Sequence, residues 1–388
     1  VSGLLGGLIP LIEEHRPSVY VHVPFCRRRC PYCAFVSAVP EKDDPDQYLE
    51  ALSREMEVRA EGIPADGAWS ILIGGGTPTL PGPEWLASLL ALVRKSAYGP
   101  ATREWSIESL PGCITPEVAD VLRIAGVDRV TLGMQSMDPV VLNSIGRADQ
   151  LPALWKAVEI LRNAGIRSIG IDLILGLPGE KIVNFRAGLE ELIAAKIPHI
   201  SAYMLSIEEG TPWGLQKIRV SDWMQRRLFT ILARQLMSGG YEQYEVSNYA
   251  LPGFACRHNQ GTWEGRELLG FGLAAVGTVS SPGGARVRRQ NTGLIEAYLA
   301  DPVGGYDEEW LTPTDRYHEA LMLGLRSCSG LPEDCGFAEE TGFSPGELRS
   351  RLEEFESRGL LCRHAGRWRT TFKGRLWLDS ILVDLFLG

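Results

Sequence analysis

Three cysteines lie close together near the N-terminal end of the sequence, at Cys26, Cys30 and Cys33. Their spacing, C-x3-C-x2-C, puts three thiols on one short loop. Iron–sulfur clusters are usually held by four cysteine thiolates, so a loop with three predicts a cubic 4Fe–4S cluster in which one iron has no protein ligand. Such an open iron can bind and reduce a small molecule, whereas a fully ligated cluster only transfers electrons.

Two simpler interpretations of these cysteines are weaker. Disulfides form in pairs, and three neighbouring thiols leave one over. A structural zinc site needs a fourth ligand close by, and the nearest candidate, His22, falls in the apolar run 19–23 that is typical of a β-strand. The other five cysteines are scattered, which favours free thiols in a reducing compartment, here the cytoplasm.

Glycines and acids follow other strand-like runs. Gly74–Pro78 contains three glycines, which let the backbone approach a ligand closely. Glu108 and Asp172 end apolar runs, and an acid in that setting is costly to bury without a partner. We therefore expect both carboxylates to bind ribose hydroxyls or an ammonium group. Taken alone, the features also fit an ordinary turn and solvated strand-end acids.

A cysteine and a histidine recur together in Cys256-Arg257-His258-Asn259, close to Trp263. Such a pair can ligate heme iron or another metal, with His258 as the axial ligand. The spacing alone favours a packed loop in which the histidine bonds to the backbone. Heme binding at His258 is therefore a hypothesis.

These residues need elements to position them, and the sequence predicts six strand–helix units before residue 215. Strands are expected at 19–23, 69–73, 104–108, 129–132, 168–173 and 199–205, with helical spacing between them. Such units form parallel strands with right-handed crossovers, closed or partly closed into a barrel. The carboxyl ends of barrel strands carry the chemistry, and six candidates lie there: Cys26, Gly76, Glu108, Gln135, Asp172 and Tyr203.

The pattern changes after residue 215. We expect a helix at 222–238, a strand at 241–248 and a loop at 252–282, followed by a helix–turn–helix and β-hairpin that resemble a winged helix. The predicted organisation is an N-terminal extension, a barrel, a barrel extension with the candidate heme loop, and a C-terminal winged-helix-like α+β domain, at 1–16, 17–215, 216–300 and 301–388. The extension reads as neither signal peptide nor membrane span.

Composition narrows the range of partners. The chain has 388 residues and a net charge of −9, which argues against nucleic acid as a partner because phosphate contacts need a basic surface. The winged-helix-like tail therefore predicts packing or substrate recognition, although an interaction protein that uses this tail is an alternative class. Peripheral association with a membrane is left open.

Together the motifs resemble the radical S-adenosylmethionine (SAM) enzymes of the oxygen-independent coproporphyrinogen III oxidase type, a family that includes the HemW heme chaperones. The resemblance runs from about residue 17 to 280, with a looser match in the tail. Its stretches are Tyr20–Cys26 with the cysteine loop, Gly74–Pro78, Ser106–Glu108, Gly126–Ser136, Gly146-Arg147, Asp172–Gly179, Gly210–Pro212, Tyr244–Ala250 and Cys256–Asn259.

The resemblance implies a partial (β/α)6 barrel with a SAM-ligated 4Fe–4S cluster on Cys26, Cys30 and Cys33. The positions that match the SAM site of the family are Tyr20, Gly76, Thr77, Glu108, Gln135, Arg147 and Asp172, with the backbone of Tyr32 and of Ser206.

One position separates the branches of the family. Oxidases carry a fourth cysteine, C-x3-C-x2-C-x-C, where this chain has Phe35, as HemW-like members do. The resemblance thus implies a HemW-like heme chaperone that binds heme and passes it to an acceptor hemoprotein, with an electron donor for the cluster. The alternative is a catalytic radical SAM enzyme, an oxidase or a HemN-like methyltransferase. The chain departs from the family at Ala34, Leu110 and Thr262.

Overall fold

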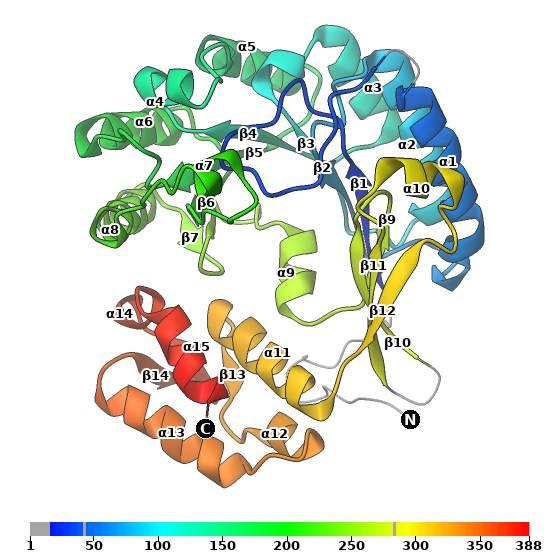
Figure 1. The fold of residues 1–388 in the computed structure, drawn as a ribbon. Coiled ribbons are helices and arrows are strands. Elements are labelled where there is room, and N and C mark those ends of the chain that lie inside the picture. Colours follow the sequence, from blue (N-terminus) through cyan, green and yellow to red (C-terminus); the bar gives the residue numbers. More distant parts are fainter. Residues whose placement is uncertain (1–15, 42–43, 282–284, 388) are drawn as a thin grey trace.

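The structure, a computed structural model, describes residues 16–41, 44–281 and 285–387. Six parallel strands form the centre of a twelve-stranded sheet. They are β1 (Ser18–Val23), β2 (Ser70–Gly75), β3 (Glu104–Ser109), β4 (Arg129–Gln135), β5 (Ser168–Leu175) and β6 (His199–Met204). Figure 1 shows the connecting helices on the outside of the curved sheet. The predicted partial (β/α)6 barrel is confirmed.

Helices connect the strands, as the helical spacing between the predicted strands indicates. They are α1 (Asp44–Arg59), α2 (Pro83–Ala97), α3 (Pro116–Ala125), α4 (Pro139–Ser144), α5 (Gln150–Asn163) and α6 (Ile182–Ala194), with short 3₁₀ turns at Ala60–Gly62 and Pro111–Cys113. The ends of α3 show why: the Thr115 hydroxyl accepts from the Val118 N–H, and Gly126 closes the helix in the left-handed region at φ 80°. These are the residue types that cap helices.

Additional strands extend both edges of the six-stranded centre. β9 (Leu268–Phe271) pairs in parallel with β1, and β10 (Val276–Ser280), β11 (Arg286–Asn291) and β12 (Tyr306–Trp310) continue outward in antiparallel pairs. At the other edge, β8 (Asn248–Ala250) pairs with β6, and β7 (Glu242–Gln243) with β8. The single strand predicted at 241–248 is therefore two short strands around a turn. The helices of this region are α7 (Pro212–Leu215), α8 (Asp222–Ser238), α9 (Arg257–Trp263) and α10 (Ile295–Ala300).

The barrel has one continuous apolar core. On one face of β1, Val19, Val21 and Val23 have no exposed surface, and on the other face Ser18 and His22 are also buried. Parallel strands buried on both faces are rich in β-branched residues for this reason. The core fixes the strands, and through them the loops at their carboxyl ends.

The C-terminal residues form a second core around the buried Trp368. Its elements, in chain order, are α11 (Pro313–Arg326), β13 (Leu331–Pro332), α12 (Gly336–Glu340), α13 (Pro345–Ser357), β14 (Leu361–His364), β15 (Arg367–Thr370), α14 (Phe372–Arg375) and α15 (Leu378–Phe386). This α+β order matches the winged-helix-like prediction. β12 still belongs to the large sheet, so the second core begins after residue 310, whereas the predicted division lies at 300.

The second core packs beside the open edge of the barrel (Figure 1). Its contacts are specific: the Val246 N–H donates to the Arg326 carbonyl at 3.1 Å, and Arg375 reaches Gln243 and the Cys328 thiol. α11 also packs on α9. The C-terminal domain therefore helps to hold α9 in place. Among the described residues, no helix combines the length and apolar character needed to cross a membrane.

Candidate functional site

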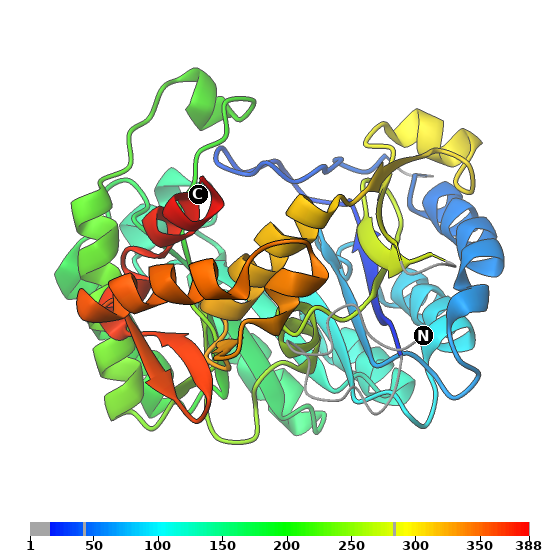
Figure 2. The same cartoon turned by 90° about the horizontal axis from the view of Figure 1, so that it is seen from below.

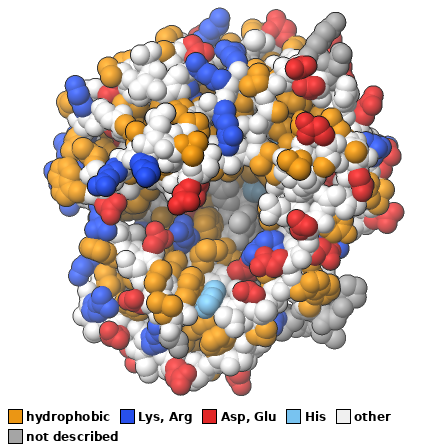
Figure 3. Space-filling model, viewed as in Figure 1, with side chains coloured by type: hydrophobic (Ala, Val, Ile, Leu, Met, Phe, Trp, Pro, Cys, Tyr) orange, Lys and Arg blue, Asp and Glu red, His pale blue; other side chains and the backbone are white. Residues whose placement is uncertain are grey.

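A cavity of about 470 Å³ opens at the carboxyl ends of the barrel strands. Figure 2 shows the loop after β1 and the α7 segment on this same side of the molecule, and Figure 3 shows the face hollowed at its centre. Most of the residues singled out in the sequence line it: Cys26, Cys30, Tyr32, Cys33, Gly76, Thr77, Glu108, Gln135, Arg147, Asp172 and Ser206. Residues up to 180 positions apart are thus brought to one site by the parallel topology.

The cysteine loop is held at both ends and in the middle. The Cys26 N–H donates to the Ala38 carbonyl and the Ala38 N–H to the Pro24 carbonyl, both at 2.9 Å. In the middle, the Trp213 N–H of α7 donates to the Pro31 carbonyl at 2.9 Å. These backbone bonds keep the loop folded over the strand ends, with the cysteine side chains beside the cavity.

Arg147 contacts the cysteines directly. Its Nε donates to the Cys30 Sγ at 3.3 Å, and its Nη1 donates to the Gly133 carbonyl at 2.7 Å. Burial, together with the neighbouring Cys33 and Cys30, nevertheless raises the pKa of the Cys26 thiol to about 11. Metal ligands must be deprotonated, so iron would displace the thiol protons here. The guanidinium offsets part of the negative charge that results.

The glycine-rich turn after β2 is shaped by close backbone approach. The Gly76 N–H donates to the Val23 carbonyl and the Thr77 N–H to the Phe25 carbonyl, each at 2.7 Å. A Cβ added at Gly76 would lie 2.5 Å from the Phe25 carbonyl oxygen, and Gly75 has φ +101°. Only glycine fits these positions without moving the cysteine loop. The turn therefore fixes how closely the cysteine loop approaches the carboxyl end of β2.

Two carboxylates face each other across the cavity, and both have raised pKa values. Burial and then the nearby Asp172 raise the pKa of Glu108 to about 7, although the Gly75 N–H donates to its Oε2 at 3.0 Å. Burial raises the pKa of Asp172 to about 6. The Oδ1 of Asp172 has no hydrogen-bond partner among the described residues. A ligand with hydroxyl or ammonium donors would satisfy both groups.

Gln135 ends β4 in a strained conformation. Its φ is 71°, in the left-handed region, and the pairing of β4 with β5 shifts register between Gly133 and Gln135. Such strain in a residue other than glycine persists only where the surroundings impose it, and it is common at functional sites. The bulge places the Gln135 side chain at the cavity wall, where it lines the site.

Tyr20 lies next to the cavity rather than on its wall. Its hydroxyl is 2.9 Å from the His22 Nδ1. Burial, and secondarily the charge of Glu108, raise the pKa of Tyr20 above its usual range. The His22 Nε2 in turn lies 3.0 Å from the Val36 carbonyl. Tyr20 therefore connects through His22 to the end of the cysteine loop, and it lies within electrostatic reach of Glu108.

His258 lies at the opposite end of the barrel. It is 5 % exposed, and its Nδ1 is 3.1 Å from the hydroxyl of Ser70, the first residue of β2. The cysteines follow the last residue of β1, so about one strand length, roughly 17 Å, separates the two ends. Burial lowers the pKa of His258 to about 4. The structure therefore does not bring His258 together with the other candidates.

A buried polar network surrounds this histidine. The Cys256 thiol donates to the Glu104 Oε1 at 3.1 Å, and Glu104 pairs with Arg129 at 2.9 Å. Both charged residues are the first of their strands, β3 and β4. Burial raises the pKa of the Cys256 thiol to about 12, so the thiol is protonated and serves as a donor. The segment is therefore packed against the amino ends of the strands, but it is the helix α9 rather than a loop, and its histidine bonds to the Ser70 hydroxyl rather than to the backbone.

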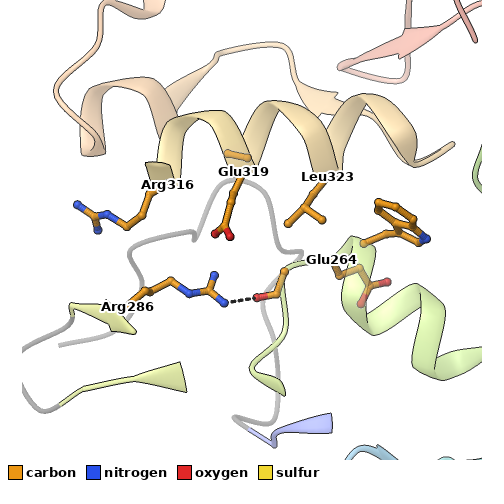
Figure 4. Close-up of a pocket in the computed structure, with 8 residues that line it drawn as sticks. Glu264, Arg286, Arg316, Glu319 and Leu323 are labelled. Atoms are coloured by element: carbon orange, nitrogen blue, oxygen red, sulfur yellow. Dashed lines mark hydrogen bonds between the residues drawn. The ribbon is translucent and has the colours of Figure 1, made fainter. Parts of the chain in front are cut away.

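The space between α9 and α11 is small and charged. Figure 4 shows Arg286, Arg316 and Glu319 around it, with Arg286 bonded to the Gly265 carbonyl at 3.4 Å. Its volume of about 10 Å³ holds at most about one water molecule. A neighbouring cavity of about 270 Å³ is lined mainly by polar side chains. His258 lines neither of them.

The cavity also contains residues that the motifs did not identify as ligands. The sequence predicts Tyr203 only as a strand-end residue and Phe35 only as the position that separates two branches of the family, and it predicts no role for Met204 or the arginines of the cysteine loop. All of them line the cavity, together with Gly75, Ser37, Ser109, Leu110, Thr131, Gly133, Asp149 and Glu208. Alternation along β4 and β5 could have identified Thr131 and Ile174, because inward positions recur at every second residue.

Comparison with known proteins follows the same division of the chain. Residues 20–192 match the radical SAM superfamily, and residues 311–377 match the HemN C-terminal domain. The heme chaperone HemW of Mycobacterium tuberculosis is 34 % identical over 392 residues, covering 98 % of this chain and 97 % of that protein. The heme chaperone HemW of Escherichia coli is 31 % identical, covering 96 % and 98 %.

The chain belongs to the HemW family of radical SAM proteins.

A solved structure supports the fold. The coproporphyrinogen III oxidase HemN of Escherichia coli, a radical SAM enzyme, superposes with a TM-score of 0.80 over 95 % of this chain and 90 % of that one, at 23 % identity. The likeness covers the barrel, its extension and the C-terminal domain together.

Radical SAM proteins use a 4Fe–4S cluster and SAM, and the residues present fit both. Three free thiols lie beside one cavity, and two buried polar atoms there, the Tyr32 hydroxyl and the Asp172 Oδ1, lack partners in the described part of the chain. Within residues 16–41, 44–281 and 285–387, no three His, Cys, Asp or Glu side chains are arranged to hold one metal ion. A cubic cluster needs thiolates farther apart, because each binds a different iron.

Proposed function

We propose that the protein is a heme chaperone of the HemW type, which binds heme beside a SAM-ligated 4Fe–4S cluster and transfers the heme to an acceptor hemoprotein. The observation that carries this proposal is the similarity to HemW proteins along nearly the whole chain, at 34 % identity. The cytoplasm, an electron donor for the cluster and a peripheral membrane contact belong to the same proposal.

Particular residues are assigned to the cofactors within it. Cys26, Cys30 and Cys33 hold three irons. SAM is held by Tyr20, Gly76, Thr77, Glu108, Gln135, Arg147 and Asp172, with the backbone of Tyr32 and of Ser206. A reduced cluster held there would be able to donate an electron to the SAM sulfonium, and in the chaperone the cluster and SAM support heme transfer. The chain's own residues orient the nucleotide, neutralise the thiolates through Arg147 and exclude water from the cavity.

Phe35 argues against an oxidase. It stands where the oxidase pattern has a fourth cysteine, and it is 65 % exposed beside the cavity. The alternative function, a catalytic radical SAM enzyme that makes a 5′-deoxyadenosyl radical, is favoured by one observation: every residue assigned to SAM lies in or next to the cavity, as turnover would require.

One sample can separate the two functions. The full chain is reconstituted with iron and sulfide without oxygen, its iron is counted, and it is then titrated with heme and incubated with SAM and dithionite. A chaperone binds heme stoichiometrically and passes it to an apo-hemoprotein. A catalytic enzyme forms 5′-deoxyadenosine in step with loss of coproporphyrinogen. The absence of heme binding by cluster-loaded protein would contradict the chaperone function.

A further inference from the structure

The mouth of the cavity carries an unusual group of exposed apolar side chains. Phe35 is 65 % exposed, Tyr203 44 % and Met204 39 %, and all three line this one cavity. Phe35 comes from the cysteine loop, and the other two end β6. Single exposed apolar residues are ordinary, but a group around one opening marks a binding surface. The group offers a contact surface for a flat apolar molecule.

Three consecutive arginines lie on the same rim. Arg27, Arg28 and Arg29 are all exposed and all line the cavity. Arg27 contacts Asp149 at 3.4 Å, whereas in the described part of the chain Arg28 and Arg29 form neither a hydrogen bond nor an ion pair. Arginine binds carboxylates with two parallel hydrogen bonds. The rim is therefore suited to a ligand that is apolar and carries carboxylates on one side.

We infer that heme lies across this mouth, with its ring against Phe35, Tyr203 and Met204 and its propionates on Arg28 and Arg29. The inference rests on the proposed chaperone function and specifies its heme site. Heme combines a flat apolar ring with two carboxylates on one edge, so it meets both halves of the rim at once. An acidic redox protein would use the arginines but leaves the three apolar side chains without a partner.

The size of the cavity places the ring at the mouth. A volume of about 470 Å³ lies in the lower half of the range for sites that enclose one drug-sized molecule. The cluster and a nucleotide take up this interior, so a macrocycle cannot enter as well. Tyr203 contributes its ring rather than a phenolate, because burial of its hydroxyl and the nearby Asp172 hold its pKa well above the usual range.

The site differs from the one predicted at His258. That histidine is 5 % exposed, bonded to Ser70, and covered by the packing of α9. Heme could reach it only after α9 left the amino ends of the strands. At the mouth, no buried element has to move.

The test is a heme titration of the cluster-loaded full chain, followed by the Soret band. Arg28→Ala/Arg29→Ala should weaken heme binding at least tenfold but leave binding of heme dimethyl ester, whose propionates are blocked, unchanged. Phe35→Ala should weaken both ligands. Matched controls are Arg123→Ala and Ile124→Ala, exposed positions on or near the end of α3 at 53 % and 72 % exposure, which should change neither. Iron content confirms that each variant keeps its cluster loop.

Several results would overturn the inference. Unchanged heme affinity in both mouth variants is one, and loss of heme in His258→Asn with full iron content is another. Slower cluster reduction by an acidic redox protein in Arg28→Ala/Arg29→Ala, with unchanged heme affinity, would assign the arginines to that protein instead. Failure of the unmodified chain to bind heme would contradict the proposed function itself.

Discussion

The two ends of the barrel use the same residue types for opposite purposes. At the carboxyl ends of the strands, thiols, carboxylates and an arginine surround a cavity, and Asp172 has an oxygen without a partner. At the amino ends, Glu104 accepts from the Cys256 thiol and pairs with Arg129, and His258 bonds to the Ser70 hydroxyl and lines none of the three cavities described above. Residue type alone therefore does not identify a site; unsatisfied groups beside space do.

The largest effect should come from the cluster loop. Cys30→Ser removes a thiolate that Arg147 contacts, and we expect loss of most of the bound iron and of SAM binding after anaerobic reconstitution. Cys362→Ser, in the C-terminal β-hairpin, is the control and should keep the iron of the unmodified chain. Equal iron content in both variants would contradict the assignment of the cluster.

A substitution at the amino ends of the barrel strands should instead lower the free energy of unfolding. Arg129→Met leaves Glu104 buried without its cation, which costs about 3–5 kcal/mol of unfolding free energy when a buried pair is broken. Urea unfolding followed by circular dichroism measures this. The cysteines proposed to bind the cluster lie at the other strand ends, so iron content per folded molecule should stay unchanged. If Arg129→Met folds normally but loses iron, the residues at the amino ends of the strands also support the cluster, which would contradict this prediction.

The two ends should also respond to pH with opposite sign. Glu108 and Asp172 have folded pKa values of about 7 and 6, above their unfolded values, so the folded state binds more protons. Their contribution to stability is highest at low pH and is lost as pH rises toward 7. His258, with a pKa of about 4, contributes stability above its unfolded pKa that is lost as pH falls toward 4.

Asp172→Asn checks this sign in the cluster-free protein. Without the ionisable group, stability at pH 8 should rise by on the order of 1–3 kcal/mol relative to pH 5, when each is compared with the unmodified chain. SAM binding to the cluster-loaded variant should weaken, because the amide cannot accept as strongly. His258→Asn should instead flatten the stability curve only on its acid side. If stability depends on pH in the same way in the unmodified chain and in both variants, the opposite pH responses of the two strand ends are contradicted.

The smallest effect on stability is expected from the exposed ion pair beside the cavity. Arg27 and Asp149 are both more than half exposed and 3.4 Å apart. Exposed pairs contribute about 0–1 kcal/mol, less at high salt. Asp149→Asn should therefore change the unfolding free energy by less than about 1 kcal/mol in 0.5 M salt. A larger loss of unfolding free energy would mean that this exposed pair stabilises the fold as the buried Glu104–Arg129 pair does.

Much of the fold could be predicted because its signals are local. The six parallel strands, most helices and the Thr115 cap depend on residues that are neighbours in sequence. The edge strands were harder: 241–248 became two strands of two and three residues, because pairing with β6 selects which residues extend. The large sheet extends to Trp310, past the division predicted at 300, because β12 pairs with β11.

The sequence by itself determined the cluster loop, the glycine turn and the acids at the strand ends, because spacing and alternation along one chain place such groups on one rim. Only the tertiary structure decided which groups lack partners, that Gln135 is strained, and that Phe35, Tyr203 and Met204 line one cavity. It also placed His258 at the amino ends of the strands. The physical reason is that burial and pairing depend on packing between segments distant in sequence, which no local pattern records.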